Sequence, residues 1–342
     1  MVSQSDYQAA RRRAAAIDRP ERSRIVVSGR DRASYLQGLL TNDIAALQAG
    51  QGCYAAYLTP QGRMIADLFV YELGDVMLLT VPREQHRTVL DKLEQFVFSE
   101  DVQLGDAAAS FSTTAIVGPD APRLVGAWTA LDEADLAALP EHGNRRGLFE
   151  QQPVVVVRVA DTGEPGFDVH VEAAHGPAFR RACESAGVPL VDQSTADALR
   201  LEAGIPRFGR DMDQETIPLE AGIESRAISF SKGCYVGQEV IIRVIHRGHG
   251  RLARRLVGLS LDGHTVPPEC VGVRVEGREV GHGTSSAMSP ALGKPIALAF
   301  VHRDFVAPGT VVWTDEQAAH VVALPFVERA RSPSESCQTG PY

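Results

Sequence analysis

The sequence has few cysteines, and none is paired with another at the spacing of a metal site or a redox dithiol. Its five thiols, an odd number, are scattered over positions 53, 183, 234, 270 and 337. Without a Cys-x-x-Cys pair, neither a structural zinc site nor a thioredoxin-like centre is expected. Scattered cysteines in a chain of this length indicate a reducing compartment rather than a disulfide framework.

Long apolar runs and an excess of basic residues are also missing. The basic run Arg11–Arg13 is followed by no apolar stretch of signal-peptide length, so it does not have the pattern of a secretory signal. No run approaches the length of a membrane span. The formal net charge of −9 argues against a general binder of nucleic acid or anionic membranes, which needs a basic surface. We therefore expect a cytoplasmic protein with no nucleic-acid and no membrane partner.

Motifs for common cofactors are absent as well. No glycine-rich loop of the dinucleotide or Walker type follows an expected strand, and no Gly-x-Ser-x-Gly elbow indicates hydrolase chemistry. Two histidines lie three residues apart in the basic turn His246–Arg251, but no acid or cysteine stands beside them, so no metal site is expected. We interpret this turn as a domain junction or as a wall of an anion-binding cavity.

What the chain does contain is a succession of short strands and helices that divides it into parts. Its 342 residues, 44% hydrophobic and 23% charged, suit a soluble protein of two or three domains. A hairpin followed by a helix occurs at 64–98 and again at 154–187, which predicts an α+β fold with two antiparallel sheets. After residue 246, short strands parted by Gly and Pro predict a small β-barrel. The expected parts are a lead-in, 1–22; a region 23–245 with α+β subdomains at about 23–120 and 144–245, separated by the Pro/Ala/Asp-rich stretch 118–143; the barrel, 246–328; and a disordered tail, 329–342.

One stretch, Lys232–Glu239, gathers more chemistry than any other. It holds an amine, a thiol, a phenol, an amide and a carboxylate within eight residues, with two glycines that let the backbone bend. Lys232 and the positive end of a helix starting near Gly237 would both favour the thiolate of Cys234, the reactive form of cysteine. The β-branched residues that follow also permit a strand, and a lone cysteine is more often an inert apolar side chain. With these neighbours, we interpret Cys234 as a functional thiol.

The octapeptide Lys-Gly-Cys-Tyr-x-Gly-Gln-Glu resembles the signature of the YgfZ-type folate-binding proteins, which support iron–sulfur enzymes. These proteins are similar to the glycine cleavage T-protein, an aminomethyltransferase. Further matches run from about residue 24 to 326 and include Thr-Asn-Asp at 41–43, the turn 162–168, the succession 200–222 and segments 281–290 and 324–326. The resemblance implies a T-protein-like fold in which two α+β subdomains and a C-terminal barrel surround a central cavity. That cavity would hold tetrahydrofolate or a folate derivative.

The resemblance also implies roles for single residues in the cavity. The matching glutamate of T-proteins contacts folate, so Glu202 is expected to accept hydrogen bonds from the pterin; without the resemblance, a solvated helix acid is expected. T-proteins carry an Asp-Asp pair of which one acid assists methylene transfer to folate. Here Ala66 replaces the first acid and Asp67 retains the second. Arg226 is expected to meet the carboxylates of the folate tail, or else to be a surface arginine.

Within the octapeptide, the resemblance makes Cys234 the working thiol, through exchange, a transient adduct or contact with a cluster. Lys232 would tune the thiol. Gln238 and Glu239 would position the loop and, with Tyr235, contribute to folate binding. A cluster normally takes four thiolates, so one cysteine cannot store it unless a partner supplies ligands.

Three functions are compatible with these residues. The first is a folate-binding accessory protein that serves iron–sulfur client or assembly proteins. The second is a tetrahydrofolate-dependent one-carbon transferase or demethylase, which Asp67 and Glu202 favour and which Ala66 and the cysteine signature oppose. The third is a scaffold in which Cys234 is structural. The first is our sequence-based interpretation.

Overall fold

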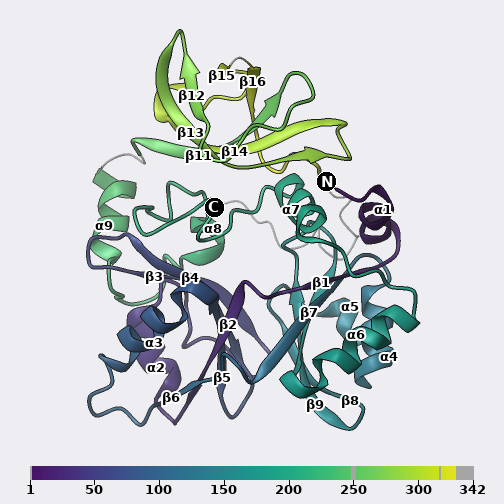
Figure 1. The fold of residues 1–342 in the computed structure, drawn as a ribbon. Helices are drawn as coiled ribbons and strands as arrows, with labels where there is room; N and C mark the ends of the chain where they lie inside the picture. Colours follow the sequence, from purple (N-terminus) through teal and green to yellow (C-terminus); the bar gives the residue numbers. More distant parts are fainter. Residues whose placement is uncertain (1, 248–251, 316, 329–342) are drawn as a thin grey trace.

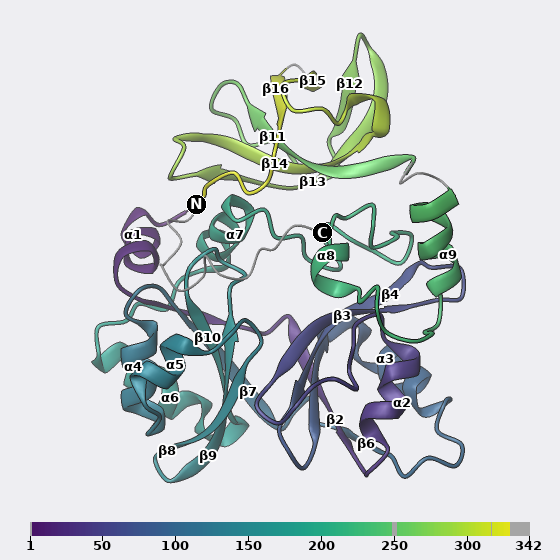
Figure 2. The ribbon, with the colours of Figure 1, turned by 180° about the vertical axis from the view of Figure 1, so that it is seen from behind.

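The computed structural model describes residues 2–247, 252–315 and 317–328. Two α+β units stand side by side, and a β-barrel lies across their upper ends (Figures 1 and 2). The helices of each unit lie on its outer side, so that the two sheets face each other across the middle of the molecule (Figure 1). The expected tail 329–342 and most of the turn His246–Arg251 lie outside the described residues.

The first unit is a five-stranded antiparallel sheet with the order β3-β4-β5-β2-β6. Its core lies between the outer face of the sheet and two helices, which contribute buried side chains such as Leu36 and Leu93. The expected hairpin is present, formed by β4 and β5. The bounds are β2, Arg22–Ser28; α2, Arg32–Leu39; β3, Gly52–Leu58; β4, Met64–Glu72; β5, Met77–Pro82; α3, His86–Glu94; and β6, Gln103–Asp106.

The second unit repeats this plan with a five-stranded antiparallel sheet of order β1-β7-β10-β9-β8. Three helices cover its outer face, where Val125, Leu136 and Phe179 join the apolar side chains of the strands. The bounds are β1, Ala15–Asp18; β7, Phe111–Val117; α4, Ala121–Thr129; α5, Glu133–Ala138; β8, Asn144–Phe149; β9, Gln152–Val159; β10, Gly166–Glu172; and α6, Gly176–Ser185.

The chain divides between these units differently from the expectation. Residues 1–22 are not a separate lead-in, because the apolar run that follows helix α1 (Gln4–Arg12) forms β1 and pairs with β7. Ala15 and Ile17 of this strand are buried against Leu199 of a later helix. The stretch 118–143 is not a boundary either, since α4 and α5 form part of the core of the second unit.

The third part is a closed, six-stranded antiparallel barrel with the order β11-β14-β13-β12-β15-β16. The expected β-barrel and the two antiparallel sheets are thus confirmed. Its interior is filled by aliphatic side chains, including Leu259, Val273 and Val301. The bounds are β11, Arg254–Leu261; β12, Gly272–Val275; β13, Arg278–Ser289; β14, Lys294–His302; β15, Val311–Thr314; and β16, Gln317–Val322.

Helix α7 (Gln193–Glu202) is the piece that joins all three parts. It begins at Asp192, whose carboxylate accepts a hydrogen bond from the backbone N–H of Thr195 at 2.8 Å. From Thr195 to its end every residue is buried, because the helix packs on α1 and on strands β13 and β14 of the barrel. The two sheets meet below it through Tyr71 and Val157. A space lined by both sheets and by α7 is left between them.

Candidate functional site

A cavity of about 890 Å³, including its open mouth, occupies this space between the sheets. The walls come from the segment between β1 and β2, from β3, β4 and β5, from the loops around β9 and β10, from α7 with the loop that follows it, and from the short helix α8 (Glu224–Ala227). No barrel residue lines it within the described chain.

Asp67 on β4 is a firmly held acid in the wall of this cavity, where a ligand contact is expected. Its carboxylate is 1% exposed and accepts two hydrogen bonds from Arg22, from Nη1 to Oδ1 at 2.8 Å and from Nη2 to Oδ2 at 3.2 Å. The hydroxyl of Tyr54 donates to Oδ2 at 3.0 Å. Burial and then the charge of Asp67 raise the pKa of Tyr54 well above its ordinary value, so the phenol remains a donor.

Aromatic rings and a second arginine surround this acid. The ring centroids of Tyr54 and Phe69 are 5.0 Å apart, and those of Phe69 and His142 are 5.3 Å apart. The guanidinium of Arg226 lies over Tyr54, 5.4 Å from its centroid, and donates to Glu141 Oε1 at 2.9 Å. Arg226 therefore lines the cavity, and the alternative of a simple surface arginine does not hold. The rings provide a flat apolar surface on which an aromatic ligand can stack.

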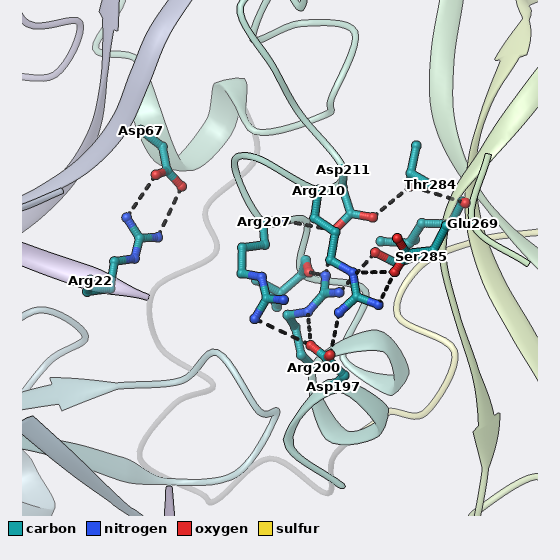
Figure 3. A network of polar contacts seen from close by, with 12 residues as sticks. Arg22, Asp67, Asp197, Arg200, Arg207, Arg210, Asp211, Glu269, Thr284 and Ser285 are labelled. Atoms are coloured by element: carbon teal, nitrogen blue, oxygen red, sulfur yellow. Dashed lines mark hydrogen bonds and ion pairs between the residues drawn. The ribbon is translucent and has the colours of Figure 1, made fainter. Parts of the chain in front are cut away.

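Three arginines share one carboxylate beside another wall, to which Arg200 and Arg207 contribute (Figure 3). Asp197 on α7 lies 3.4 Å from Nε of Arg200, 3.4 Å from Nη1 of Arg207, and in close contact with Arg210. Burial opposes ionisation of Asp197, but the charges of Arg207, Arg200 and Arg210 lower its pKa. Because Arg200 also pairs with Asp211 and Arg210 with Glu269, Arg207 is the arginine of this group that is left to meet an anionic group of a ligand.

The same network fixes the loop after α7 to the barrel (Figure 3). Asp211, 1% exposed, accepts from Arg200 Nη1 at 2.6 Å and from Thr284 Oγ1 at 2.6 Å. Arg200 also donates to Ser285 Oγ at 3.1 Å. Thus Thr284 and Ser285 of β13 hold a wall of the cavity in place without lining it.

Two side chains of the cavity retain hydrogen-bonding capacity for a ligand. Glu21 has a buried Oε2 with no partner in the described structure, and its Oε1 lies 3.9 Å from Nη1 of Arg19. Among the described residues, the guanidinium of Arg207 has an acidic partner only in Asp197, 3.4 Å away. Both Glu21 and Arg207 also line an adjoining cavity of about 700 Å³, to which Arg83 contributes a further positive charge. An anionic tail could therefore run from one cavity into the other.

The structure does not place Glu202 where the sequence predicts it, and we correct that expectation. Glu202 is fully buried and accepts hydrogen bonds from Tyr7 Oη at 2.6 Å and from Ala291 N at 3.1 Å, with closer contacts to Arg11 and Ser289. Both carboxylate oxygens are thus used within the protein. On a helix of 3.6 residues per turn, a residue two places after Arg200 lies on the opposite side, so Glu202 joins α1 to the barrel instead.

Lys232 is also placed differently from the expectation that it tunes the thiol. Its Nζ donates to three backbone carbonyls, of Gln37 at 2.6 Å, Leu40 at 2.6 Å and Asn42 at 2.8 Å. These carbonyls lie at and just beyond the C-terminus of α2, where a positive charge is favourable. Burial lowers the pKa of Lys232 to about 8. These three hydrogen bonds tie the octapeptide to the end of α2 and the turn that follows it.

The rest of the octapeptide lies outside the cavity. Cys234 is exposed, Tyr235 is buried in the core formed with β3, and Glu239 is exposed. The expected short helix is present as α9 (Gln238–Ile242), preceded by Gly237 at a φ of 86°. A Cβ on Gly237 would lie 2.6 Å from the carbonyl oxygen of Thr59, so only glycine fits this position. Of the residues predicted to bind the cofactor, Asp67 and Arg226 line the cavity, whereas Glu202, Tyr235, Gln238 and Glu239 do not.

Replacing Lys232 with methionine is expected to lower the free energy of unfolding by about 2 kcal/mol, because hydrogen bonds to a charged group each contribute about 1.5–3 kcal/mol and water can replace some of them. Urea unfolding of the purified protein measures this. Lys294→Met, at an exposed lysine of β14, is the matched control and should change stability by less than about 0.5 kcal/mol. Equal effects of the two substitutions would show that the carbonyl contacts of Lys232 contribute nothing.

Several residues of the cavity belong to no sequence motif and could not be predicted from one, among them Glu21, Arg22, Tyr54 and His142. One signal is present in hindsight. Arg22 and Arg24 alternate with buried residues along β2, and two charges at the period of a strand indicate a polar patch on one face of a buried sheet. Sequence analysis alone gives no way to tell which other segments meet that face.

In the described chain, no group of three or more His, Cys, Asp or Glu side chains is arranged to hold a metal ion. Among the helices of residues 2–247, 252–315 and 317–328, none is long and apolar enough to cross a membrane.

The fold and the cavity define a class of protein: two facing α+β units with a capping barrel and a cavity between their sheets. Residues 1–232 match the GCVT N-terminal domain family, and residues 254–328 match the glycine cleavage T-protein C-terminal barrel domain. Together these matches span most of the chain. The chain belongs to the family of the glycine cleavage T-protein.

Individual relatives cover nearly the whole chain. An aminomethyltransferase of Streptomyces coelicolor is 33% identical over 337 residues, covering 95% of this chain and 90% of its own. One of Rubrobacter xylanophilus is 32% identical, covering 98% and 89%. The crystal structure of the glycine cleavage system aminomethyltransferase T from Bartonella henselae superposes with a TM-score of 0.85 at 23% identity, over 95% of this chain and 89% of that one, and shares its fold.

Proposed function

We propose that the central cavity binds a reduced folate and that this chain is a tetrahydrofolate-dependent aminomethyltransferase. Relatives of similar length bear the name aminomethyltransferase. The observation that carries the proposal is Asp67, a buried carboxylate of the cavity that Arg22 and Tyr54 hold in one orientation. This favours the one-carbon transferase over the accessory role for iron–sulfur proteins that the sequence-based interpretation preferred.

The side chains of the cavity fit a folate. A pterin edge presents adjacent N–H donors, and the unpartnered Oε2 of Glu21 supplies an acceptor for them. The rings of Tyr54 and Phe69 offer a stacking surface for the aromatic parts of the ligand. The glutamate tail carries carboxylates, for which guanidinium groups are well suited, and Arg207 and Arg226 lie in the walls.

The alanine that replaces the first acid of the T-protein pair leaves this cavity intact. Ala66 is buried between the first sheet and its outer helices, in the same cluster as Leu68 and Val70. Because side chains alternate along a strand, Asp67 and Phe69 point to the opposite face and line the cavity. The retained acid is therefore the one that a ligand in the cavity can reach, and the departure at Ala66 counts less against a transferase than the sequence alone indicates.

Bound tetrahydrofolate would supply the amine nitrogens that take up the carbon of an aminomethyl group, with ammonia leaving. The protein's part is to orient the ligand and to hold a negative charge beside it. Arg22 binds both oxygens of Asp67 and keeps them in position. The Tyr54 hydroxyl also donates a hydrogen bond to Oδ2, at 3.0 Å. Oδ2 would accept a proton or an N–H hydrogen bond from the ligand in place of this bond.

Asp67→Asn is expected to lower kcat by about 10²–10⁴-fold, the usual contribution of a proton-transferring group, while the affinity for tetrahydrofolate falls by much less. Calorimetric titration measures binding, and formation of methylene-tetrahydrofolate from the aminomethyl donor of the glycine cleavage system measures turnover. The control is Asp161→Asn, at another acid of the cavity, which pairs with Arg19. Turnover by Asp67→Asn at the wild-type rate would contradict the proposal.

A second candidate function is favoured by one observation, the exposed thiol of Cys234 on a loop held firmly by Lys232. Such a thiol suits the YgfZ-type accessory role, in which a partner supplies the remaining cluster ligands. Cys234→Ser in the same assays separates the two functions. The transferase should retain turnover in this variant. Two results together would favour the accessory role. The wild type would bind folate without turnover, and Cys234→Ser would no longer support an iron–sulfur client enzyme.

A further inference from the structure

An ion pair between two separate segments lies in the wall of the central cavity, where the wall is most open to solvent. Nη2 of Arg226 on α8 donates to Oε1 of Glu141, which lies in the loop between α5 and β8 of the second unit, at 2.9 Å. Of the charged side chains in the described wall, Glu141 is the most exposed acid, at 42%, and Arg226 is the most exposed arginine, at 32%. This exposure places the pair at the mouth of the cavity.

The backbone is fixed on each side of this ion pair. Asn42 Nδ2 donates to the backbone carbonyl of Arg226 at 3.0 Å, and the hydroxyl of Thr41 donates to the carbonyl of the residue that follows at 2.6 Å. On the other side, the backbone N–H of His142 donates to the carbonyl of Arg158 at 3.0 Å. A ligand group can therefore replace one member of the pair through movement of side chains alone.

The ion pair is also weak enough to be exchanged. Exposed ion pairs contribute little to stability, because water screens the charges and two long side chains must be ordered. The imidazole Nε2 of His142 lies 3.6 Å from the same oxygen of Glu141, but burial lowers the pKa of His142 to about 4, so the ring is neutral near pH 7. Among the described residues, Glu141 is the one acid that pairs with Arg226.

The position of Arg226 matches the spacing of groups in a folate. Its guanidinium lies over the ring of Tyr54, 5.4 Å from the centroid, and the hydroxyl of that ring donates to Asp67 at 3.0 Å. One aromatic ring therefore lies between Arg226 and the acid that is proposed to act on the ligand. In a folate, one benzoyl ring likewise lies between an amine that takes up the carbon and the carboxylates of the tail. A ligand with this amine at Asp67 would bring a tail carboxylate within reach of Arg226.

We propose that Glu141 is a specificity-determining residue, which holds Arg226 in the free protein and yields it to a tail carboxylate of the ligand. Because one carboxylate replaces another, the guanidinium is paired in both states. A ligand with a neutral tail cannot replace Glu141 and gains nothing from Arg226, so the exchange selects for an anionic tail. Glu141 acts through Arg226 and has no catalytic part. This inference rests on the proposed binding of folate.

The test compares two probes on the full-length protein, tetrahydrofolate and its bis-amide, in which carboxamides replace both tail carboxylates. Calorimetric titration measures both affinities. In Glu141→Gln the affinity for tetrahydrofolate should rise about three- to fivefold, because an exposed ion pair no longer competes with the ligand, whereas that for the bis-amide should stay within about twofold. In Arg226→Met the affinity for tetrahydrofolate should fall about tenfold, through loss of a charge-assisted hydrogen bond. Adding Glu141→Gln to Arg226→Met should then give no gain.

The matched control is Glu215→Gln, at an exposed glutamate that pairs with Arg63 and does not line the described cavity. It removes the same charge and should leave both affinities unchanged. Three results would overturn the inference: an unchanged affinity for tetrahydrofolate in Glu141→Gln, an equal gain for the bis-amide, or an equal gain in the Arg226→Met background. Each of these leaves the proposed function standing if the wild type binds tetrahydrofolate. A wild type that does not bind tetrahydrofolate would overturn both.

Discussion

Replacing Glu202 with alanine is expected to lower the free energy of unfolding by about 3–5 kcal/mol, the usual effect of removing one partner of a buried ion pair. The carboxylate accepts from four groups on two parts of the chain: Tyr7 and Arg11 of α1, and Ser289 and the backbone of residue 291 at the end of β13. Burial and then Glu202 raise the pKa of Tyr7 to about 12, so the phenol would remain a buried donor without its acceptor. Urea unfolding followed by circular dichroism measures the loss.

The same variant separates a structural role from a ligand-binding one. Calorimetric titration of the folded fraction should give a tetrahydrofolate affinity within about threefold of the wild type, since Glu202 does not line the cavity. Glu164→Ala is the matched control, because Glu164 is the other acidic partner of Arg11, but its side chain is 11% exposed whereas that of Glu202 is fully buried. Glu164→Ala should lower the free energy of unfolding by clearly less than Glu202→Ala does. Loss of folate binding at unchanged stability would restore Glu202 as the pterin contact.

Acidification is expected to remove about 3 kcal/mol of stability through His142 alone. Burial, opposed by Glu141 and reinforced by Arg226, lowers the pKa of His142 to about 4 in the folded chain. The unfolded chain takes up this proton at its ordinary pKa of 6.5, so below that pH unfolding binds a proton and is favoured. The contribution is fully present above pH 6.5 and is lost as the pH falls from 6.5 to 4, at 1.36 kcal/mol per pH unit.

The measurement is the free energy of unfolding of wild type and His142→Asn at intervals from pH 7.5 to pH 4. The difference between the two should shrink as the pH falls, since asparagine does not titrate and also tolerates the φ of 65° at this position. His264→Asn, at an exposed histidine of the barrel, should leave the pH profile unchanged. A constant difference between wild type and His142→Asn across the range would show that His142 titrates normally.

The regular parts of the fold could be predicted because they depend on local patterns. Alternating apolar residues around Gly74 predict the hairpin of β4 and β5, and the short strands after residue 246 predict the barrel; both are present. The helix expected near Gly237 begins there. The first 22 residues were harder to place, since nothing local in a four-residue strand shows that its partner is β7, about 100 residues away.

The candidate site was predicted only in part, for a different reason. A motif identifies a residue but not the side of its helix that will face the ligand. The segment around Glu202 was recognised, yet Asp197 and Arg200 of the same helix line the cavity. Likewise Lys232 stands two residues from Cys234, but its contacts are with a turn 190 or more residues earlier in the chain. Such contacts depend on packing between distant segments, which spacing along the sequence does not encode.

The hydrogen bond between Thr284 and Asp211 has a consequence for how this protein can change over evolutionary time. It joins residues 73 positions apart, one in the barrel and one in the loop that forms a wall of the cavity. A barrel without a hydrogen-bond donor at the place of Thr284 would leave the loop without this anchor, even though no side chain that lines the cavity had been altered. A barrel exchanged with that of a relative should therefore preserve ligand affinity only when it keeps a donor at this position.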